Sequence, residues 1–229
     1  MGWVGKIEPV RVLRRLPWLP ALPGLPALPA LPALFIVLAL ACTNRPPEDP
    51  KSYVAHLDAA RAEKDAAFKS APDGEPVPLN RRAELVPLAY FPIDPAYAVP
   101  AVLQPSADRA TMIMPTSTGG QREMRRVGSL AFTLKGQALR LTAFVESGAP
   151  NVDHLFVPFT DLTSGSETYP GGRYLDLDRN ATGLYVIDFN RAYHPFCYYN
   201  PSYDCPYPPA ENRLKIPIRA GERVKKPKT

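Results

Sequence analysis

Two alternating apolar runs around residues 135–137 constrain the fold more than any other part of the sequence. Apolar residues occupy positions 130, 132 and 134, and then positions 139, 141, 143 and 145. The sequence Lys135-Gly136-Gln137 separates the two runs. A period of two places alternate side chains on one face of a strand. Two such runs joined by a short glycine-containing turn predict an antiparallel hairpin with one buried and one solvent-exposed face.

Further short apolar segments, each bounded by turn-forming residues, predict more strands. They occupy residues 98–103, 111–114, 155–159, 184–189 and 214–218. A helix is predicted over residues 53–70, where apolar residues recur at helical spacing, with Ser52 as N-cap and a stop at Pro72-Asp73-Gly74. About seven short strands behind one helix predict a mainly β fold. We expect a small antiparallel barrel or sandwich preceded by one N-terminal helix.

The first 41 residues have the pattern of a signal peptide. Four basic residues precede a long apolar run, and tandem Leu-Pro-Ala/Gly triplets within it prevent a membrane-spanning helix. Only residues 33–41 are apolar and free of proline, a length typical of a signal peptide. The run ends at Cys42 in a sequence that resembles a bacterial lipobox. The alternative is an ordinary secretory signal in which Cys42 is incidental.

This interpretation divides the chain into four parts. Residues 1–41 are a signal peptide, 42–51 a lipidated tether, 52–222 a single β-rich domain and 223–229 a basic tail. We expect an exported protein that Cys42 anchors to a bacterial membrane, in the periplasm or at the outer face. The formal charge of +5 lies largely in the leader and the tail. A nearly neutral domain without a nucleic-acid motif predicts no nucleic-acid partner.

Three residues near the C-terminal end allow either a metal site or a disulfide bond. His194, Cys197 and Cys205 would need a fourth ligand to hold zinc, for which Asp188, Asp204 or Glu211 could serve. In an exported chain, thiols face an oxidising compartment. We therefore favour a disulfide between Cys197 and Cys205, which would contribute about 2–3 kcal/mol by closing a short loop. No metal site is predicted.

Candidate ligand-binding residues gather between residues 164 and 194. The glycines of Gly171-Gly172-Arg173 could expose backbone amides, and the guanidinium of Arg173 could hold an anion. The alternative is a tight turn in which Arg173 pairs with Glu167 or Asp176. Carboxylate, amide and phenol groups also follow the strand predicted to end at residue 189, where they could bind a ligand or form internal hydrogen bonds. The predicted ligand-binding residues are Glu167, Tyr169, Arg173, Tyr174, Asp188, Asn190 and Tyr193.

These residues predict the binding of a small polar or anionic ligand or of an envelope component. One alternative is a hydrolase with Asp188 or Glu167 as general base, although no Gly-x-Ser-x-Gly motif accompanies them. Others are a flavin-binding small barrel and a structural envelope protein. The sequence does not identify a cofactor.

Several uncommon sequence words occur in a fixed order toward the C-terminus. They are Phe-Thr-Asp-Leu-Thr-Ser-Gly at 159–165, Glu-Thr-Tyr at 167–169, Gly-Arg-Tyr-Leu-Asp at 172–176, Asp-Phe-Asn-Arg-Ala-Tyr at 188–193, Cys-Pro at 205–206, Pro-Pro at 208–209, Glu-Asn-Arg-Leu at 211–214 and Ala-Gly-Glu at 220–222. Together they resemble the family called domain of unknown function 1684, over residues 53–222. The resemblance implies one domain and an important C-terminal third, and it carries no established reaction.

Overall fold

The structure, a computed structural model, describes residues 49–107, 110–149, 152–180 and 183–225. These residues belong to one compact unit of the chain, residues 45–229. The predicted signal peptide, Cys42 and its lipidation, most of the tether and the end of the basic tail lie outside the described residues. Among the described helices, none combines the length and the apolar character that a membrane crossing requires.

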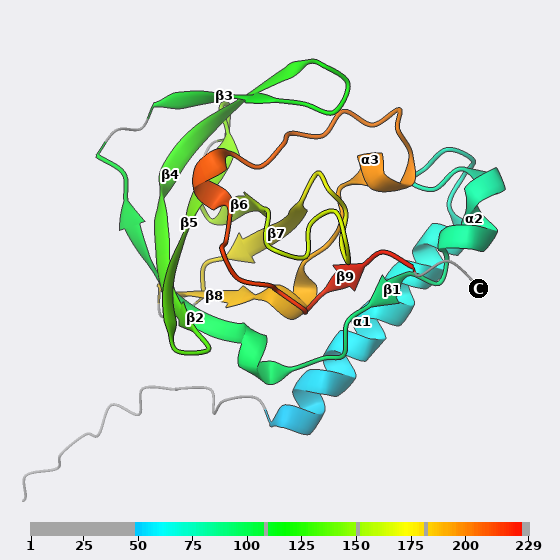
Figure 1. Ribbon diagram of the computed structural model, residues 1–229, viewed down its shortest axis with the longest axis horizontal. Helices are drawn as coiled ribbons and strands as arrows, with labels where there is room; N and C mark the ends of the chain where they lie inside the picture. The colour runs from blue at the N-terminus through cyan, green and yellow to red at the C-terminus, as the bar shows by residue number, and fades with distance from the viewer. Residues whose placement is uncertain (1–48, 108–109, 150–151, 181–182, 226–229) are drawn as a thin grey trace, which may run out of the picture. The chain divides into compact units, whose positions relative to one another are not determined.

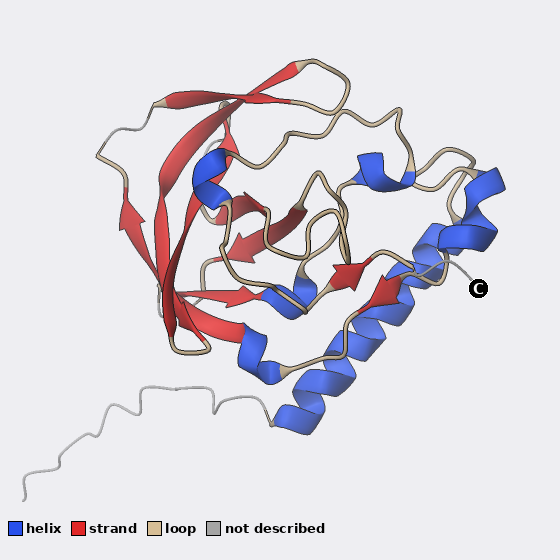
Figure 2. Cartoon of the chain, viewed as in Figure 1, coloured by secondary structure: helices blue, strands red, loops and turns tan. Residues whose placement is uncertain are grey.

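A seven-stranded antiparallel sheet curls into a nearly closed barrel (Figures 1 and 2). Its path runs through β7 (Arg173–Asp178), β6 (His154–Phe159), β5 (Gln137–Glu146), β4 (Gln121–Leu134), β2 (Ala98–Pro105) and β8 (Tyr185–Asp188), while β3 (Thr111–Pro115) pairs with β4 off this path. The two end strands, β7 and β8, contact each other. The interior is filled by side chains such as Leu130, Leu141, Val157 and Ile187, all of which are buried. The predicted mainly β fold with a helix in front is confirmed.

The predicted hairpin is confirmed as β4 and β5. Leu134 faces Gln137 across the turn, and Lys135 and Gly136 both have positive φ. Positive φ at both central residues is characteristic of a type I′ turn, whose twist matches that of the strands. The expected solvent-exposed face is wrong for the second half of β5, where Thr142 and Phe144 are also buried. Phe144 packs there in a second apolar cluster, which includes Met114.

One predicted strand is absent, and one strand of the seven-stranded sheet was not predicted. Residues 214–218 form no strand. The backbones of Leu214 and Ile216 each bind the backbone of residues 160–162, but at Ile218 side chains take this place: Asp161 accepts from its amide, and Arg173 donates to its carbonyl. Residues 173–178 form β7, although Arg173 and Tyr174 were predicted to belong to a ligand site that follows a glycine turn. The smaller elements are α2 (Leu79–Leu85), β1 (Ala89–Tyr90), η1 (Pro95–Tyr97), η2 (Phe189–Arg191), α3 (Phe196–Tyr199), η3 (Ala210–Asn212) and β9 (Glu222–Arg223), which pairs with β1.

The predicted helix is α1 (Pro50–Ser70), and it begins three residues earlier than expected. The cap is Asp49 rather than Ser52, since the Asp49 carboxylate accepts from the amide of Ser52 at 3.3 Å, with proline in the first turn. The helix contacts the rest of the fold partly through polar side chains. The Tyr53 hydroxyl donates to Asp188 at 2.9 Å. These contacts tie the N-terminal helix to the C-terminal third of the chain.

Candidate functional site

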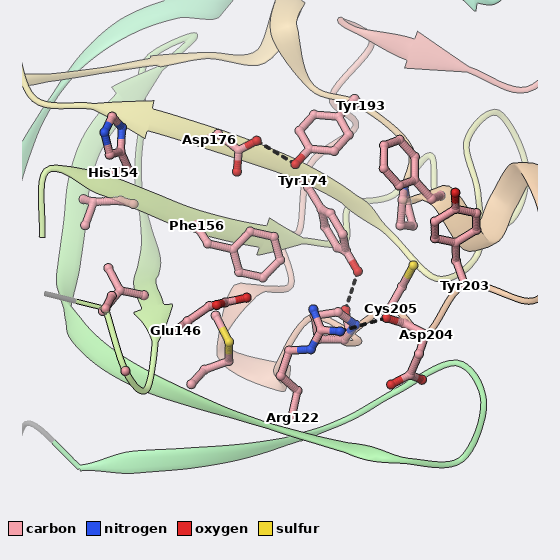
Figure 3. Close-up of a pocket in the computed structure, with 18 of the residues that line it drawn as sticks. Arg122, Glu146, His154, Phe156, Tyr174, Asp176, Tyr193, Tyr203, Asp204 and Cys205 are labelled. Atoms are coloured by element: carbon pink, nitrogen blue, oxygen red, sulfur yellow. Dashed lines mark hydrogen bonds between the residues drawn. The ribbon is translucent and has the colours of Figure 1, made fainter. Parts of the chain in front are cut away.

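A cleft of about 880 Å³ opens beside the ends of β4, β5, β6 and β7 (Figure 3). The segment from Tyr193 to Pro206 closes its other side. We call it the aromatic cleft because aromatic rings form much of its wall. It is lined by Arg122, Met124, Val145, Glu146, Gly148, Ala149, His154, Leu155, Phe156, Tyr174, Asp176, Asp178, Tyr193, Pro195, Phe196, Tyr203, Asp204, Cys205 and Pro206.

Strand β7 and the segment after η2 position the two tyrosines of this cleft. The backbones of Tyr174 and Tyr193 form a bridge with N···O distances of 2.9 and 3.1 Å. The Tyr174 ring meets Phe156 and Tyr193 edge to face, with centroids 4.8 and 5.8 Å apart. Such edge-to-face pairs are favourable beyond the area that they bury. Three rings from three segments therefore form one continuous wall.

The tyrosine hydroxyls are bound to the protein itself. The hydroxyl of Tyr174 donates to the carbonyl of Pro206 at 2.6 Å, and that of Tyr193 donates to Asp176 at 2.7 Å. Burial raises the pKa of both phenols above the usual range. Both therefore stay protonated at neutral pH and act as donors. A ligand in the cleft would therefore contact the rings of these tyrosines rather than their hydroxyls.

Carboxylates outnumber cations around the aromatic cleft. Glu146, Asp176, Asp178 and Asp204 contribute negative charge, and Arg122 is the one lysine or arginine among the described residues that line the cleft. Arg122 donates to the backbone carbonyl of Asp204 at 3.2 Å (Figure 3). The cleft therefore carries net negative charge, which disfavours an anionic ligand.

The two C-terminal cysteines lie side by side next to this cleft. Both are buried free thiols, and the amide of Cys197 donates to the Cys205 sulfur at 3.2 Å. A hydrogen bond from Cys205 lowers the pKa of the Cys197 thiol to about 6, and the same bond raises the pKa of Cys205. The predicted disulfide between them stays a prediction. Within the described residues no group of three His, Cys, Asp or Glu could hold a metal ion, and the His194 ring accepts from the amide of Tyr169.

The seven predicted ligand-binding residues do not form one site. Tyr174 and Tyr193 line the aromatic cleft. Glu167 lines a second cleft, and Tyr169 packs its ring against Tyr198 with centroids 5.4 Å apart. The other three, Arg173, Asp188 and Asn190, belong to hydrogen-bond networks in the interior or beneath α1.

Arg173 is not available to hold an anion, contrary to the prediction. Its side chain is 0% exposed and pairs with Asp161 at 2.9 Å. The guanidinium also donates to the backbone carbonyls of Ile218, Ala220 and Glu222. The alternative partners Glu167 and Asp176 are also wrong. The arginine organises the C-terminal segment because its terminal nitrogens replace the missing strand contacts there.

Asp188 and Asn190 form a buried hydrogen-bond network rather than a ligand site. The Asp188 carboxylate accepts from Tyr53 at 2.9 Å, from the Asn190 amide at 3.0 Å and from Arg191 at 3.2 Å. The Asn190 side chain donates to the carbonyl of Asp94 at 2.8 Å. This outcome is the internal network that the sequence left open as an alternative. It connects α1, η1 and η2.

A buried carboxylate that the sequence did not single out anchors the same region. Glu222 is 2% exposed and accepts from Lys64 at 2.5 Å and from the hydroxyl of Tyr199 at 2.5 Å. It also accepts from the backbone amide of His194 at 2.7 Å. The His194 ring accepts from the amide of Tyr169 at 3.3 Å, and burial lowers its pKa well below the usual range. The ring is therefore neutral and structural.

The sequence missed most residues of the aromatic cleft, and one signal could have indicated them. On β6, Leu155 and Val157 point into the core, whereas Phe156 occupies the face that alternation predicts to be exposed. A large apolar residue on such a face indicates a second contact surface. Arg122 and Asp204 carry no comparable signal, because single charges on strands and loops are usually solvent-exposed.

Comparisons with known proteins agree with this architecture. The sequence profile of the family described as protein of unknown function (DUF1684) matches residues 83–223. The chain is also similar to the uncharacterized protein from gene locus rrnAC0354 of Haloarcula marismortui, a solution NMR structure. The two share 35% identity and a TM-score of 0.60, over 77% of this chain and 97% of that one. No curated protein matches the chain. Since the family profile covers more than half of the sequence, the chain belongs to the DUF1684 family.

Proposed function

We propose that the protein binds a small ligand in the aromatic cleft. The observation that carries this proposal is a cleft of about 880 Å³ walled by Phe156, Tyr174 and Tyr193 and bordered by carboxylates. Ligand sites usually have volumes of about 300–1,000 Å³ and combine an apolar wall with a few polar groups. The cleft has both properties.

The charges around the cleft define the class of ligand. Four carboxylates surround it, and one arginine, Arg122, opposes them. A positive group would be attracted by the carboxylates and by the faces of the aromatic rings. We therefore propose a ligand with an apolar or aromatic body and a neutral polar or cationic group.

The cleft is pre-organised for such a ligand. Hydrogen bonds from Tyr174 to Pro206 and from Tyr193 to Asp176 hold the two rings in place before a ligand arrives. Side chains that are already ordered lose less conformational entropy on binding. This rigidity favours a ligand site over an incidental surface depression.

The hydrolase alternative has less support from the geometry. Both oxygens of Asp188 accept hydrogen bonds from neighbouring residues, and both oxygens of Glu167 accept from Arg219. A general base needs an oxygen within reach of the proton that it removes. Either residue would first have to lose these partners.

We also propose that the protein is exported and anchored to a membrane by a lipid on Cys42. The leader described above supports this, since its apolar segment has the length of a signal peptide and ends at a cysteine. Mass spectrometry of the protein purified from the cell envelope tests it. We expect a mature chain that begins at Cys42 with an added acyl mass, and a Cys42→Ala variant without that mass. An unmodified Cys42 in the envelope-purified protein would contradict the anchor.

Ligand binding can be tested with a matched pair of small aromatic probes. Benzylamine and benzoate are similar in size and opposite in charge, and backbone amide NMR shifts can follow their titration. We expect benzylamine to cause saturable shifts at residues lining the aromatic cleft, and Asp176→Asn to weaken its binding. Asp153→Asn, a change outside the cleft lining, serves as control. Preferential binding of benzoate, or shifts confined to other regions, would refute the proposal.

A further inference from the structure

A second cleft, of about 600 Å³, contains the predicted site residue Glu167. We call it the arginine cleft. It lies where α1, β1, β9 and the loop between β6 and β7 meet. It is lined by Arg61, Tyr90, Phe91, Pro92, Ser166, Glu167, Arg219, Arg223 and Val224. Three guanidinium groups and one carboxylate make its lining positive by two charges.

Each arginine is held differently. Arg61 comes from α1, donates to the carbonyl of Phe91 at 3.3 Å and stacks over Tyr90 at 4.3 Å from the ring centroid. Arg223 donates through Nε to the carbonyl of Tyr90 at 3.2 Å. Arg219 forms an ion pair with Glu167, with N···O distances of 2.8–3.1 Å. The backbone and Tyr90 thus fix two of the three guanidinium groups.

The wall of this cleft has unused hydrogen-bonding capacity. Among the described residues, the terminal nitrogens of Arg223 have no hydrogen-bond or ion-pair partner. The Nε of Arg61 and the hydroxyl of Tyr90 also have no hydrogen-bond partner among the described residues, but both atoms are buried and are not exposed to the cleft, as is the Nε of Arg173 in the interior. The hydrogen-bonding capacity that a ligand could reach therefore lies at Arg223. Arg173 contrasts with Arg223, because both of its terminal nitrogens are bound to protein oxygens.

We propose that the arginine cleft binds the phosphate group of a small soluble molecule. A phosphate monoester carries about −1.5 to −2 charge at neutral pH and accepts several hydrogen bonds, which matches a site with a net charge of +2. Guanidinium groups bind phosphate in bidentate geometry. Tyr90, Phe91 and Val224 supply apolar surface for the rest of the molecule.

Glu167 has a definite role in this site. Its carboxylate forms an ion pair with Arg219 and is the one negative charge among the described lining residues. A bound phosphate would therefore have to share Arg219 with Glu167. Removing this charge should strengthen binding, whereas removing an arginine should weaken it. Opposite effects from neighbouring residues distinguish a phosphate site from a general loss of structure.

Titration with inorganic phosphate at constant ionic strength tests the proposal, with backbone amide NMR shifts as the readout. We expect saturable shifts in the segments at residues 90–92, 166–167 and 219–224. Arg223→Ala should weaken binding about tenfold or more, since it removes a charge-assisted contact. Glu167→Gln should strengthen binding about threefold, as expected for one exposed charge. Arg140→Ala, an exposed arginine on β5 outside the cleft lining, should change nothing.

Three outcomes would overturn the proposal. The first is phosphate binding that Arg223→Ala and Glu167→Gln both leave unchanged. The second is the absence of saturable shifts in the arginine cleft. The third is binding to vesicles containing phosphatidylglycerol without any saturable response to inorganic phosphate or glycerol 3-phosphate, which would indicate a lipid surface instead. Because benzylamine reports on the aromatic cleft, failure here is separable from failure of the proposed function.

Discussion

The charged residues of the C-terminal third fall into two regions that differ in how their polar groups are satisfied. In the interior network, formed by Asp161, Arg173, His194 and Glu222, both terminal nitrogens of Arg173 and the carboxylates of Asp161 and Glu222 bind protein partners. In the arginine cleft, the terminal nitrogens of Arg223 have no partner within the part of the chain that the structure describes. The same residue type therefore holds the fold in one region and is available to a ligand in the other. Changes in the first region should alter stability, and changes in the second should alter binding.

Arg173→Ala should give the largest effect and test this division directly. The substitution leaves Asp161 as a buried carboxylate without its cation and leaves carbonyls of residues 218, 220 and 222 without a donor. Breaking a buried pair by removing one partner costs about 3–5 kcal/mol. We expect a loss of this size in the free energy of unfolding, measured by urea denaturation.

Arg219→Ala is the matched control for this experiment. It removes an ion pair that is exposed on both sides, with side-chain exposures of 57% for Arg219 and 39% for Glu167. Its unfolding midpoint should stay close to that of the unchanged protein, because exposed pairs contribute little. Equal losses for the two variants would contradict the division between interior and cleft.

The pH dependence of stability should show the contribution of His194. Burial, with help from Arg173 and Lys64, lowers the pKa of this imidazole well below its usual range. Below about pH 6.5 the unfolded chain binds a proton that the folded protein does not. The contribution of His194 to the free energy of unfolding should therefore be fully present above that pH. On acidification it should fall by up to about 1.4 kcal/mol per pH unit.

Comparing two histidine variants isolates this contribution. His194→Gln keeps an acceptor for the amide of Tyr169 and should flatten the fall in unfolding free energy below about pH 6.5. His154→Gln changes a histidine that is 82% exposed. Its unfolding free energy should stay close to that of the unchanged protein, because the imidazole and its partner Asp178 are both exposed. If both variants kept the full slope, His194 would not be the group responsible.

The sequence was most informative where local pattern and long-range packing agree. The hairpin of β4 and β5 follows from alternation and the turn Lys135-Gly136, since both turn residues adopt the positive φ that their strands require. Helix α1 was predicted from the helical spacing of its apolar residues. The β-rich fold follows from the number of short strands. These features depend on neighbours within a few residues.

The site was harder to predict because it depends on contacts between distant residues. Arg173 looks like a ligand residue beside two glycines, and only the return of residues 218–222 makes it internal. Glu167 was expected to accompany it, yet Glu167 pairs with Arg219, 52 positions away. Arg61 reaches the arginine cleft from α1. Alternation in β6 could have indicated Phe156, whereas no local pattern indicates which arginine keeps unpaired terminal nitrogens among the described residues.

Tyr193→Phe should have a small effect on stability and the most informative effect on binding in the aromatic cleft. The phenylalanine keeps the ring against Tyr174 and removes the hydrogen bond to the exposed carboxylate of Asp176. Because that partner can bind water instead, the loss in unfolding free energy should be about 1 kcal/mol or less. Benzylamine should bind a few fold more weakly, since Asp176 is no longer oriented. Tyr185→Phe removes a hydroxyl outside both clefts and serves as control. Unchanged benzylamine affinity in Tyr193→Phe would show that the ring alone, without an oriented carboxylate, forms the site.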